Sequence, residues 1–311
     1  MSQTPAPAAE KSTGAGLGFA IAAYGLWGFL PIFFVLLVPA TAVEIVAWRI
    51  ALSLVFCALL LTVTRTWGRL FAILRDRRTV LIMGAAGILI LINWLVYVYA
   101  TLSDRVVEAS LGYFTNPIVT VLLGVFVLRE RLRIAQWVSI GISAVAVLVL
   151  AINYGQLPWI ALVLAFSFGT YGLIKKQVGG RVDALSGLTL ETAWLTPLAI
   201  IALIVTSVTS GLTIGTVSTA HTLLLLSAGA VTAVPLLLFA AAARRLPLTY
   251  LGLTQYLAPI LQFLFGVFVF HEDMPFARWM GFALVWVALI VLTIDMFAAG
   301  RGPRRARVLP A

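Results

Sequence analysis

The sequence predicts an all-α polytopic membrane protein, with ten transmembrane helices arranged as two inverted five-helix repeats. Composition indicates the class, because 62% of the 311 residues are hydrophobic and only 10% are charged. A soluble domain carries roughly 25% charged residues. This chain therefore has too little charge to cover a water-soluble globule, and we expect lipid to surround it. The lengths of the apolar segments and an internal repeat predict the arrangement.

Ten apolar segments have the length of a membrane span. A bilayer core about 30 Å thick needs about 20 helical residues at 1.5 Å each. The first segment is longer than the apolar core of about 7–15 residues in a cleavable signal peptide, so we expect it to be retained. The expected spans are 16–37, 42–63, 79–100, 106–128, 134–152, 158–174, 184–206, 221–242, 248–270 and 277–298.

The segments outside these spans are short. Residues 1–15 are rich in Pro, Ala and Ser/Thr and predict a disordered cytoplasmic tail, and residues 299–311 predict a basic cytoplasmic tail. The link at 64–78 contains an amphipathic stripe that predicts a short helix in the membrane interface. Its apolar members are Trp67, Leu70, Phe71 and Leu74.

The basic residues predict the orientation in the membrane. If the N-terminus is cytoplasmic, 18 of the 21 Lys and Arg residues fall on the cytoplasmic side, Arg105 and Arg278 fall outside, and Arg49 lies within a span. Lys and Arg are retained on the cytoplasmic side during insertion. We therefore expect a multi-pass protein of the bacterial inner membrane with both termini inside. The net charge of +10 then reflects topology, and we exclude nucleic acid as a partner.

The second half of the chain repeats the first at a shift of 142 residues. Matched Pro, Gly, Glu and Trp residues carry the repeat, because they coincide by chance less often than Leu or Val. Each half, 16–152 and 158–298, holds five expected spans, an odd number, so the second half enters the membrane inverted. Inverted repeats are typical of secondary transporters. The matches place Pro117, Gly124, Glu130 and Trp137 on Pro259, Gly266, Glu272 and Trp279.

Two prolines lie near the middle of the fourth and ninth expected spans. Pro117 and Pro259 each remove one backbone hydrogen bond and free a carbonyl four residues earlier, at Tyr113 and Gln255. A free carbonyl at that depth needs protein or water beside it. A structural kink and a binding role both fit, and a gate would satisfy both. We predict that the two prolines are gating positions.

Polar residues cluster beside these prolines on the third, fourth and ninth spans. Helical spacing places Glu108, Thr115 and Asn116 on one face. Two interpretations stay open, namely the lining of a solute cavity and hydrogen bonding between helices. The candidate lining residues are Asn93, Tyr97, Glu108, Tyr113, Thr115, Asn116, Gln255 and Gln262.

Two charged residues lie inside expected spans. Arg49 is in the second span, where an unpaired charge costs roughly 2.5–3.5 kcal/mol. The 142-residue shift aligns it with Glu191 in the seventh span. We therefore expect the two charges to meet near the pseudo-twofold axis, either as a structural ion pair or in a gating or coupling role, and we add both to the candidate solute site.

Several strings in the chain also resemble a known family. The chain resembles the RarD proteins of the EamA family, in the drug/metabolite transporter superfamily, along nearly the whole membrane part. The resemblance implies ten helices and the export or exchange of small metabolites or drugs. Trp48 departs from the usual His of the family. The matching strings are EIVAWR at 44–49, NWLVYVYA at 93–100, EASLGYFTNPIVTVLLG at 108–124, FSFGTYGLIKK at 166–176, GLTLETAWLTP at 187–197 and RLPLTYLGLTQYLAP at 245–259.

The expected function is therefore secondary transport of small organic metabolites or drugs by alternating access. The chain has one cysteine, Cys57, two histidines and no nucleotide-binding or metalloprotease motif, so we expect neither an enzyme nor a cofactor or metal. Two alternatives are a membrane enzyme acting on lipid-linked substrates and a non-transporting membrane component. The expected partners are a small organic solute, a coupling proton and the lipid bilayer, and a homodimer is compatible with them.

Overall fold

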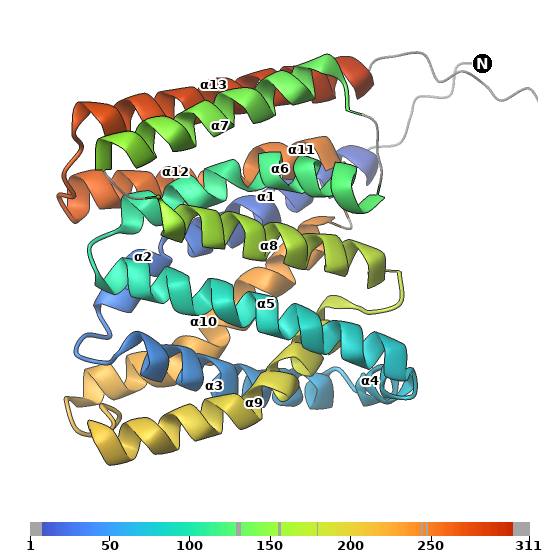
Figure 1. Ribbon diagram of the computed structural model, residues 1–311. Helices are drawn as coiled ribbons and strands as arrows, with labels where there is room; N and C mark the ends of the chain where they lie inside the picture. Colours follow the sequence, from blue (N-terminus) through green and yellow to red (C-terminus); the bar gives the residue numbers. More distant parts are fainter. Residues whose placement is uncertain are drawn as a thin grey trace, which may run out of the picture. The chain divides into compact units, whose positions relative to one another are not determined.

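The structure is a computed structural model that describes residues 8–128, 132–154, 157–178, 180–243, 245–246 and 248–300, and the regular elements in these ranges are all helical (Figure 1). The elements are α1 (Ala8–Gly28), α2 (Leu30–Val35), α3 (Ala42–Val63), α4 (Trp67–Leu74), α5 (Arg77–Leu102), α6 (Val106–Leu128), α7 (Ile134–Tyr154), α8 (Trp159–Val178), α9 (Ala184–Thr209), α10 (Thr219–Ala243), α11 (Leu248–Thr254), α12 (Leu257–Leu264), the π-helix η1 (Phe265–Val269) and α13 (Phe276–Gly300).

Eight stretches of the described chain have the length and apolar composition of a membrane span, which supports a multi-pass membrane protein. Two shorter apolar stretches, Trp159–Lys175 and Leu257–Val269, lie where we expected the sixth and ninth spans. The sixth expected span lies in α8, which has 20 residues, Trp159–Val178. The ninth is shorter because its helix is interrupted by a turn between α11 and α12. Length and composition therefore support eight of the ten expected spans in the described chain, and the count of ten stays a prediction.

The ends of the chain differ in part from the expectation. Helix α1 begins at Ala8 rather than near residue 16, so part of the expected N-terminal tail is helical. The rest of that tail, 1–7, and most of the expected C-terminal tail, 301–311, lie outside the described residues.

The short helix expected in the link at 64–78 is present as α4. Its residue Leu70 is buried together with Ile73, whereas Phe71 and Leu74 are exposed. Trp67 stacks on Phe71, with ring centroids 5.9 Å apart. The helix therefore has one face packed on the protein and an exposed apolar edge, as expected for a helix in the interface.

Side chains cap the long helices where they begin. Thr41 Oγ1 accepts a hydrogen bond from the backbone N–H of Glu44 at 3.2 Å, and Asp183 Oδ1 accepts one from Ser186 at 3.1 Å. Helix α6 is capped from a distant part of the chain, because Glu272 accepts from the N–H groups of Val106 and Val107. Such bonds satisfy N–H groups that have no partner inside the helix.

The chain divides into two compact units. The first comprises Met1–Asn116 and Trp159–Asp273, and the second comprises Pro117–Pro158 and Met274–Ala311. Helices α7 and α13 lie side by side in the second unit. A Cβ added at Gly281 would be 2.7 Å from Leu150, so this glycine allows the close approach of the two helices. Every described candidate side chain except the gating position Pro117 belongs to the first unit.

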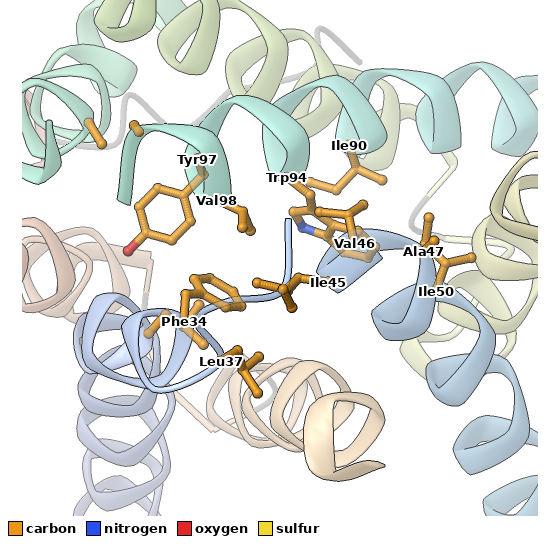
Figure 2. Packing of buried hydrophobic residues seen from close by; sticks show 14 of the residues in the cluster. Phe34, Leu37, Ile45, Val46, Ala47, Ile50, Ile90, Trp94, Tyr97 and Val98 are labelled. Carbon is orange, nitrogen blue, oxygen red and sulfur yellow. The ribbon is translucent and has the colours of Figure 1, made fainter. Parts of the chain in front are cut away.

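The core of the first unit lies between α2, α3 and α5. Figure 2 shows Trp94 and Tyr97 of α5 beside Phe34 of α2 and Ile45 of α3, all of them buried. Around this core α3 packs against α9 and α10, and α5 packs against α8 and α9. Glycines permit the closest of these contacts. A Cβ at Gly229 on α10 would lie 2.5 Å from the backbone of Leu52, far inside van der Waals contact.

Candidate functional site

The buried arginine of α3 lies among aromatic rings. Arg49 is 4% exposed, and its Nε donates a hydrogen bond of 2.7 Å to Thr232 Oγ1 on α10. Its guanidinium carbon is 4.2 Å from the ring centre of Trp94 and 5.6 Å from that of Phe34. In the described part of the chain, no acidic side chain is within ion-pair distance of Arg49, and its Nη1 has no hydrogen-bond partner. Cation–π contacts and one hydrogen bond therefore hold this charge.

Asn93 connects three helices. Its Nδ2 donates to the carbonyl of Leu164 at 3.2 Å and to Ser167 Oγ at 3.1 Å, both on α8. Its Oδ1 accepts from the Tyr113 hydroxyl of α6 at 2.9 Å. Tyr97, one turn further along α5, packs edge-to-face on Tyr113 with centroids 5.5 Å apart. The structure thus brings together three of the expected site residues, Asn93, Tyr97 and Tyr113.

The buried acid of α9 has its own partners. Glu191 is 1% exposed and accepts a hydrogen bond of 2.8 Å from Lys175 Nζ on α8. The Tyr171 hydroxyl donates to the same carboxylate at 3.2 Å. The expected ion pair between Arg49 and Glu191 is therefore wrong, because Glu191 pairs with Lys175.

The directions of α3 and α9 explain why these charges do not meet. Leu61, near the end of α3, shares a cluster with Leu190 near the start of α9. At the other end, Glu44 at the start of α3 accepts from the N–H of Thr213, just beyond α9, at 2.8 Å. The two helices are antiparallel, and each charge lies in the first half of its own helix. Antiparallel helices place their first halves at opposite ends of the pair, so Arg49 and Glu191 lie apart.

A row of aromatic rings runs from the vicinity of Arg49 to the Lys175–Glu191 pair. Successive centroid distances are 6.0 Å from Phe34 to Tyr97, 5.5 Å from Tyr97 to Tyr113, 5.9 Å from Tyr113 to Phe168, and 5.9 Å from Phe168 to Tyr171. One end of the row lies beside Arg49 and the other beside the Glu191 carboxylate. We call these five residues the aromatic row.

Several residues of this site were not expected from the sequence, among them Phe34, Phe168 and Lys175. Phe34 and Phe168 look like ordinary core residues in an apolar sequence. Lys175 carried a usable signal, because it follows Tyr171 by four residues and so shares its helical face. We had counted it only among the basic residues that set the topology.

Other expected lining residues bond to the protein itself. Glu108 pairs with Arg105 at 2.6 Å and accepts a hydrogen bond of 3.1 Å from the N–H of Ile160, in the first turn of α8. Thr115 Oγ1 donates to a carbonyl of its own helix. Gln262 Nε2 donates to the carbonyl of Trp27 at 3.2 Å. The interpretation as contacts between helices therefore fits Glu108 and Gln262. Asn116 is half-buried at the end of the first unit.

The two prolines occupy different local structures. Helix α6 continues through Pro117. Before Pro259 the chain turns at Gln255 and Tyr256, between α11 and α12, and the π-helix η1 follows. Both prolines interrupt the hydrogen-bond pattern of a helix, but only the ninth expected span is broken into separate helices.

The fold and the buried charged and aromatic groups define a multi-pass membrane protein. Comparisons with known proteins identify its family. Residues 14–152 match the EamA-like transporter family. The chain is 48% identical to Protein RarD of Streptomyces exfoliatus over 95% of this chain and 93% of the relative. It is 38% identical to an uncharacterized transporter of Vibrio cholerae over 94% of this chain and 96% of the relative.

A solved crystal structure shares the fold, with a TM-score of 0.56 and 19% identity, over 92% of this chain and 97% of that chain. The chain belongs to the RarD proteins of the EamA family, as the quoted sequence strings predicted.

Proposed function

We propose that the chain is a secondary transporter, not an enzyme, that moves small organic metabolites or drugs across the bacterial inner membrane by alternating access. The observation that carries this proposal is that helix contacts recur under the 142-residue shift. In the first unit α1 packs on α10 and α8 packs on α5; likewise α3 packs on α10 and α9 packs on α5. The shift matches α1 with α8, α3 with α9, and α5 with α10. Exchanging matched helices therefore turns the α1–α10 contact into the α8–α5 contact, and the α3–α10 contact into the α9–α5 contact.

Details of the helix ends and contacts support the same relation. The caps Thr41 and Asp183 are separated by 142 residues, and so are Asp76 and Ser218, which cap α5 and α10. The packing glycines Gly87 and Gly229 are also separated by 142 residues. Gly87 faces α9 at Glu191, and Gly229 faces α3 at Leu52. These matches support ten helices in two inverted halves, 16–152 and 158–298.

Two such halves supply two conformations of similar energy. In the proposed topology the half of α3 that holds Arg49 lies toward the outside, and the Lys175–Glu191 pair lies toward the cytoplasm. A solute that enters from either side would meet the aromatic row between them. Alternating access requires that the two ends open in turn. The coupling proton and the homodimer stay predictions.

Flux measurement tests the proposal against its alternatives. The purified chain is reconstituted in liposomes loaded with a mixture of labelled small metabolites, and efflux is followed by mass spectrometry with and without a pH gradient. A transporter should release some solutes faster than empty liposomes do, without ATP. No release of any solute, together with turnover of a lipid-linked substrate, would favour an enzyme. No release and no turnover would favour a non-transporting component.

The orientation makes a separate prediction. The 18 basic residues on one side predict a cytoplasmic C-terminus. A reporter that is active only in the cytoplasm, fused after Arg307, should give signal, and the same fusion with a periplasmic reporter should be silent. The reverse pattern would overturn the topology.

The two prolines are proposed as gating positions. Pro117→Ala and Pro259→Ala each allow one more backbone hydrogen bond and stiffen one half. We expect normal insertion, slower flux and opposite shifts in the side that stays open. Cysteines at Thr115 and Gln255 in a chain that lacks Cys57 report this through labelling by impermeant thiol reagents. Unchanged flux and labelling in both variants would show that the prolines only pack.

A further inference from the structure

We propose that Arg49 binds the carboxylate of an organic anion whose apolar or aromatic body lies against Trp94 and Phe34. The inference rests on the proposed transport function and names the class of solute for that site.

Arg49 is a buried cation with no acid at ion-pair distance among the described residues. Arg105 pairs with Glu108, Arg133 with Asp295 and Lys175 with Glu191, and each of these cations is more exposed than Arg49. In the described ranges Arg49 has no such acid. An uncompensated charge inside a membrane helix is costly, so residues of this kind usually mark a ligand or ion path.

Glu44, the acid on the same helix α3, already accepts hydrogen bonds from another residue. Glu44 caps the region after α9, where it accepts from both the N–H and the hydroxyl of Thr213 at 2.8 and 2.9 Å. The repeat partner of Arg49, Glu191, is satisfied by Lys175. In the second half of the chain, Lys175 therefore balances the buried charge of Glu191. In the first half, we infer that a bound anion supplies the charge that balances Arg49.

The unused hydrogen-bonding groups specify the sign of the ligand. Within the residues that the structure describes, Arg49 Nη1 and the Tyr97 hydroxyl are buried and have no hydrogen-bond partner. Both side chains lie against Phe34: its ring centre is 5.6 Å from the Arg49 guanidinium carbon and 6.0 Å from the ring centre of Tyr97. Guanidinium is only a donor, and a tyrosine hydroxyl readily donates. A carboxylate has two acceptor oxygens and satisfies both donors at once, with charge-assisted bonds to Arg49.

The surroundings favour an organic anion over a bare ion. The ring of Trp94 is 4.2 Å from the guanidinium carbon, and Phe34 and Tyr97 face each other with centroids 6.0 Å apart. Flat apolar faces beside a cation suit a carboxylate attached to a ring or short apolar chain. A small hydrated ion such as chloride would gain little from these rings.

Thermal unfolding of the purified full chain in detergent tests the proposal without any flux. The probes are benzoate, benzyl alcohol, benzylammonium and inorganic phosphate at equal concentration and ionic strength. Benzoate should raise the Tm by a few degrees at ten or more times its Kd. The other three should not. Arg49→Gln should abolish the benzoate shift, and Arg49→Lys should reduce it because Lys loses the two-pronged contact.

Arg105→Gln is the matched control. Arg105 also lies beside a tryptophan, Trp159, at 5.8 Å, but it has its own acid, so the benzoate shift should survive its replacement. Equal shifts with benzoate in the wild-type chain and Arg49→Gln, or no shift with benzoate at all, would overturn the proposal. A Tm shift with phosphate as large as that with benzoate would contradict the claim that the ligand is an organic anion. Because binding is read here without flux, a chain that transports solutes but fails this test refutes only the inference.

Discussion

Replacing Lys175 with Met is expected to destabilise the chain by about 3–5 kcal/mol, because it leaves the buried carboxylate of Glu191 without a counter-charge. The pair is joined at 2.8 Å, and the Glu191 side chain is 2% exposed. Thermal unfolding and the yield of folded protein in detergent measure the loss. The double replacement Lys175→Met with Glu191→Leu removes both charges and should recover most of it.

Arg49→Gln provides the comparison for this result. It removes a buried cation that leaves no acid behind, so the loss of a hydrogen bond and cation–π contacts is offset by relief of the buried charge. We expect a change of about 1 kcal/mol or less in the absence of ligand. If Arg49→Gln destabilises the chain as strongly as Lys175→Met, Arg49 has an acidic partner and the assignment of the charges is wrong.

Gly229→Ala is the second replacement with a large expected effect. Its Cβ would lie 2.5 Å from the carbonyl carbon and oxygen of Leu52, so α10 and α3 must move apart. Overpacking of this kind costs typically 1–3 kcal/mol. A lowered Tm and a lower yield of folded protein are the expected readouts.

Gly25→Ala is the matched control, because a Cβ there meets nothing within 4 Å. It should be neutral or stabilising, since Ala is favoured over Gly in a helix by about 1 kcal/mol. Gly87→Ala should fall between the two, since its nearest contact is 3.4 Å. Equal stability of all three variants would show that these helices do not pack as closely as described.

The helices could be predicted because their signals are local. Apolar length marks each span, and polar residues such as Thr41 and Asp183 mark helix starts. Helix ends were harder to predict. Helix α1 begins earlier than expected because residues 8–15 lie beyond the prolines of the tail and begin with the good helix formers Ala, Glu and Lys.

The site was predicted only in part because its contacts depend on depth and direction. Asn93 and Tyr113 were identified as polar groups among apolar ones, and they do meet. The 142-residue shift aligns Arg49 with Glu191 but carries no information on where each charge lies along two antiparallel helices. It also could not distinguish a continuous helix at Pro117 from a broken one at Pro259, because the same residue type allows both.

Distances between spin labels test the central claim, that two inverted halves open in turn. In a chain without Cys57, one sample carries labelled cysteines at Ser103 and Ser210, expected outside, and another carries them at Arg69 and Arg181, expected inside. On addition of a solute that the flux assay identifies, one distance should lengthen as the other shortens. Distances that stay fixed, or that both change in the same direction, would contradict alternating access.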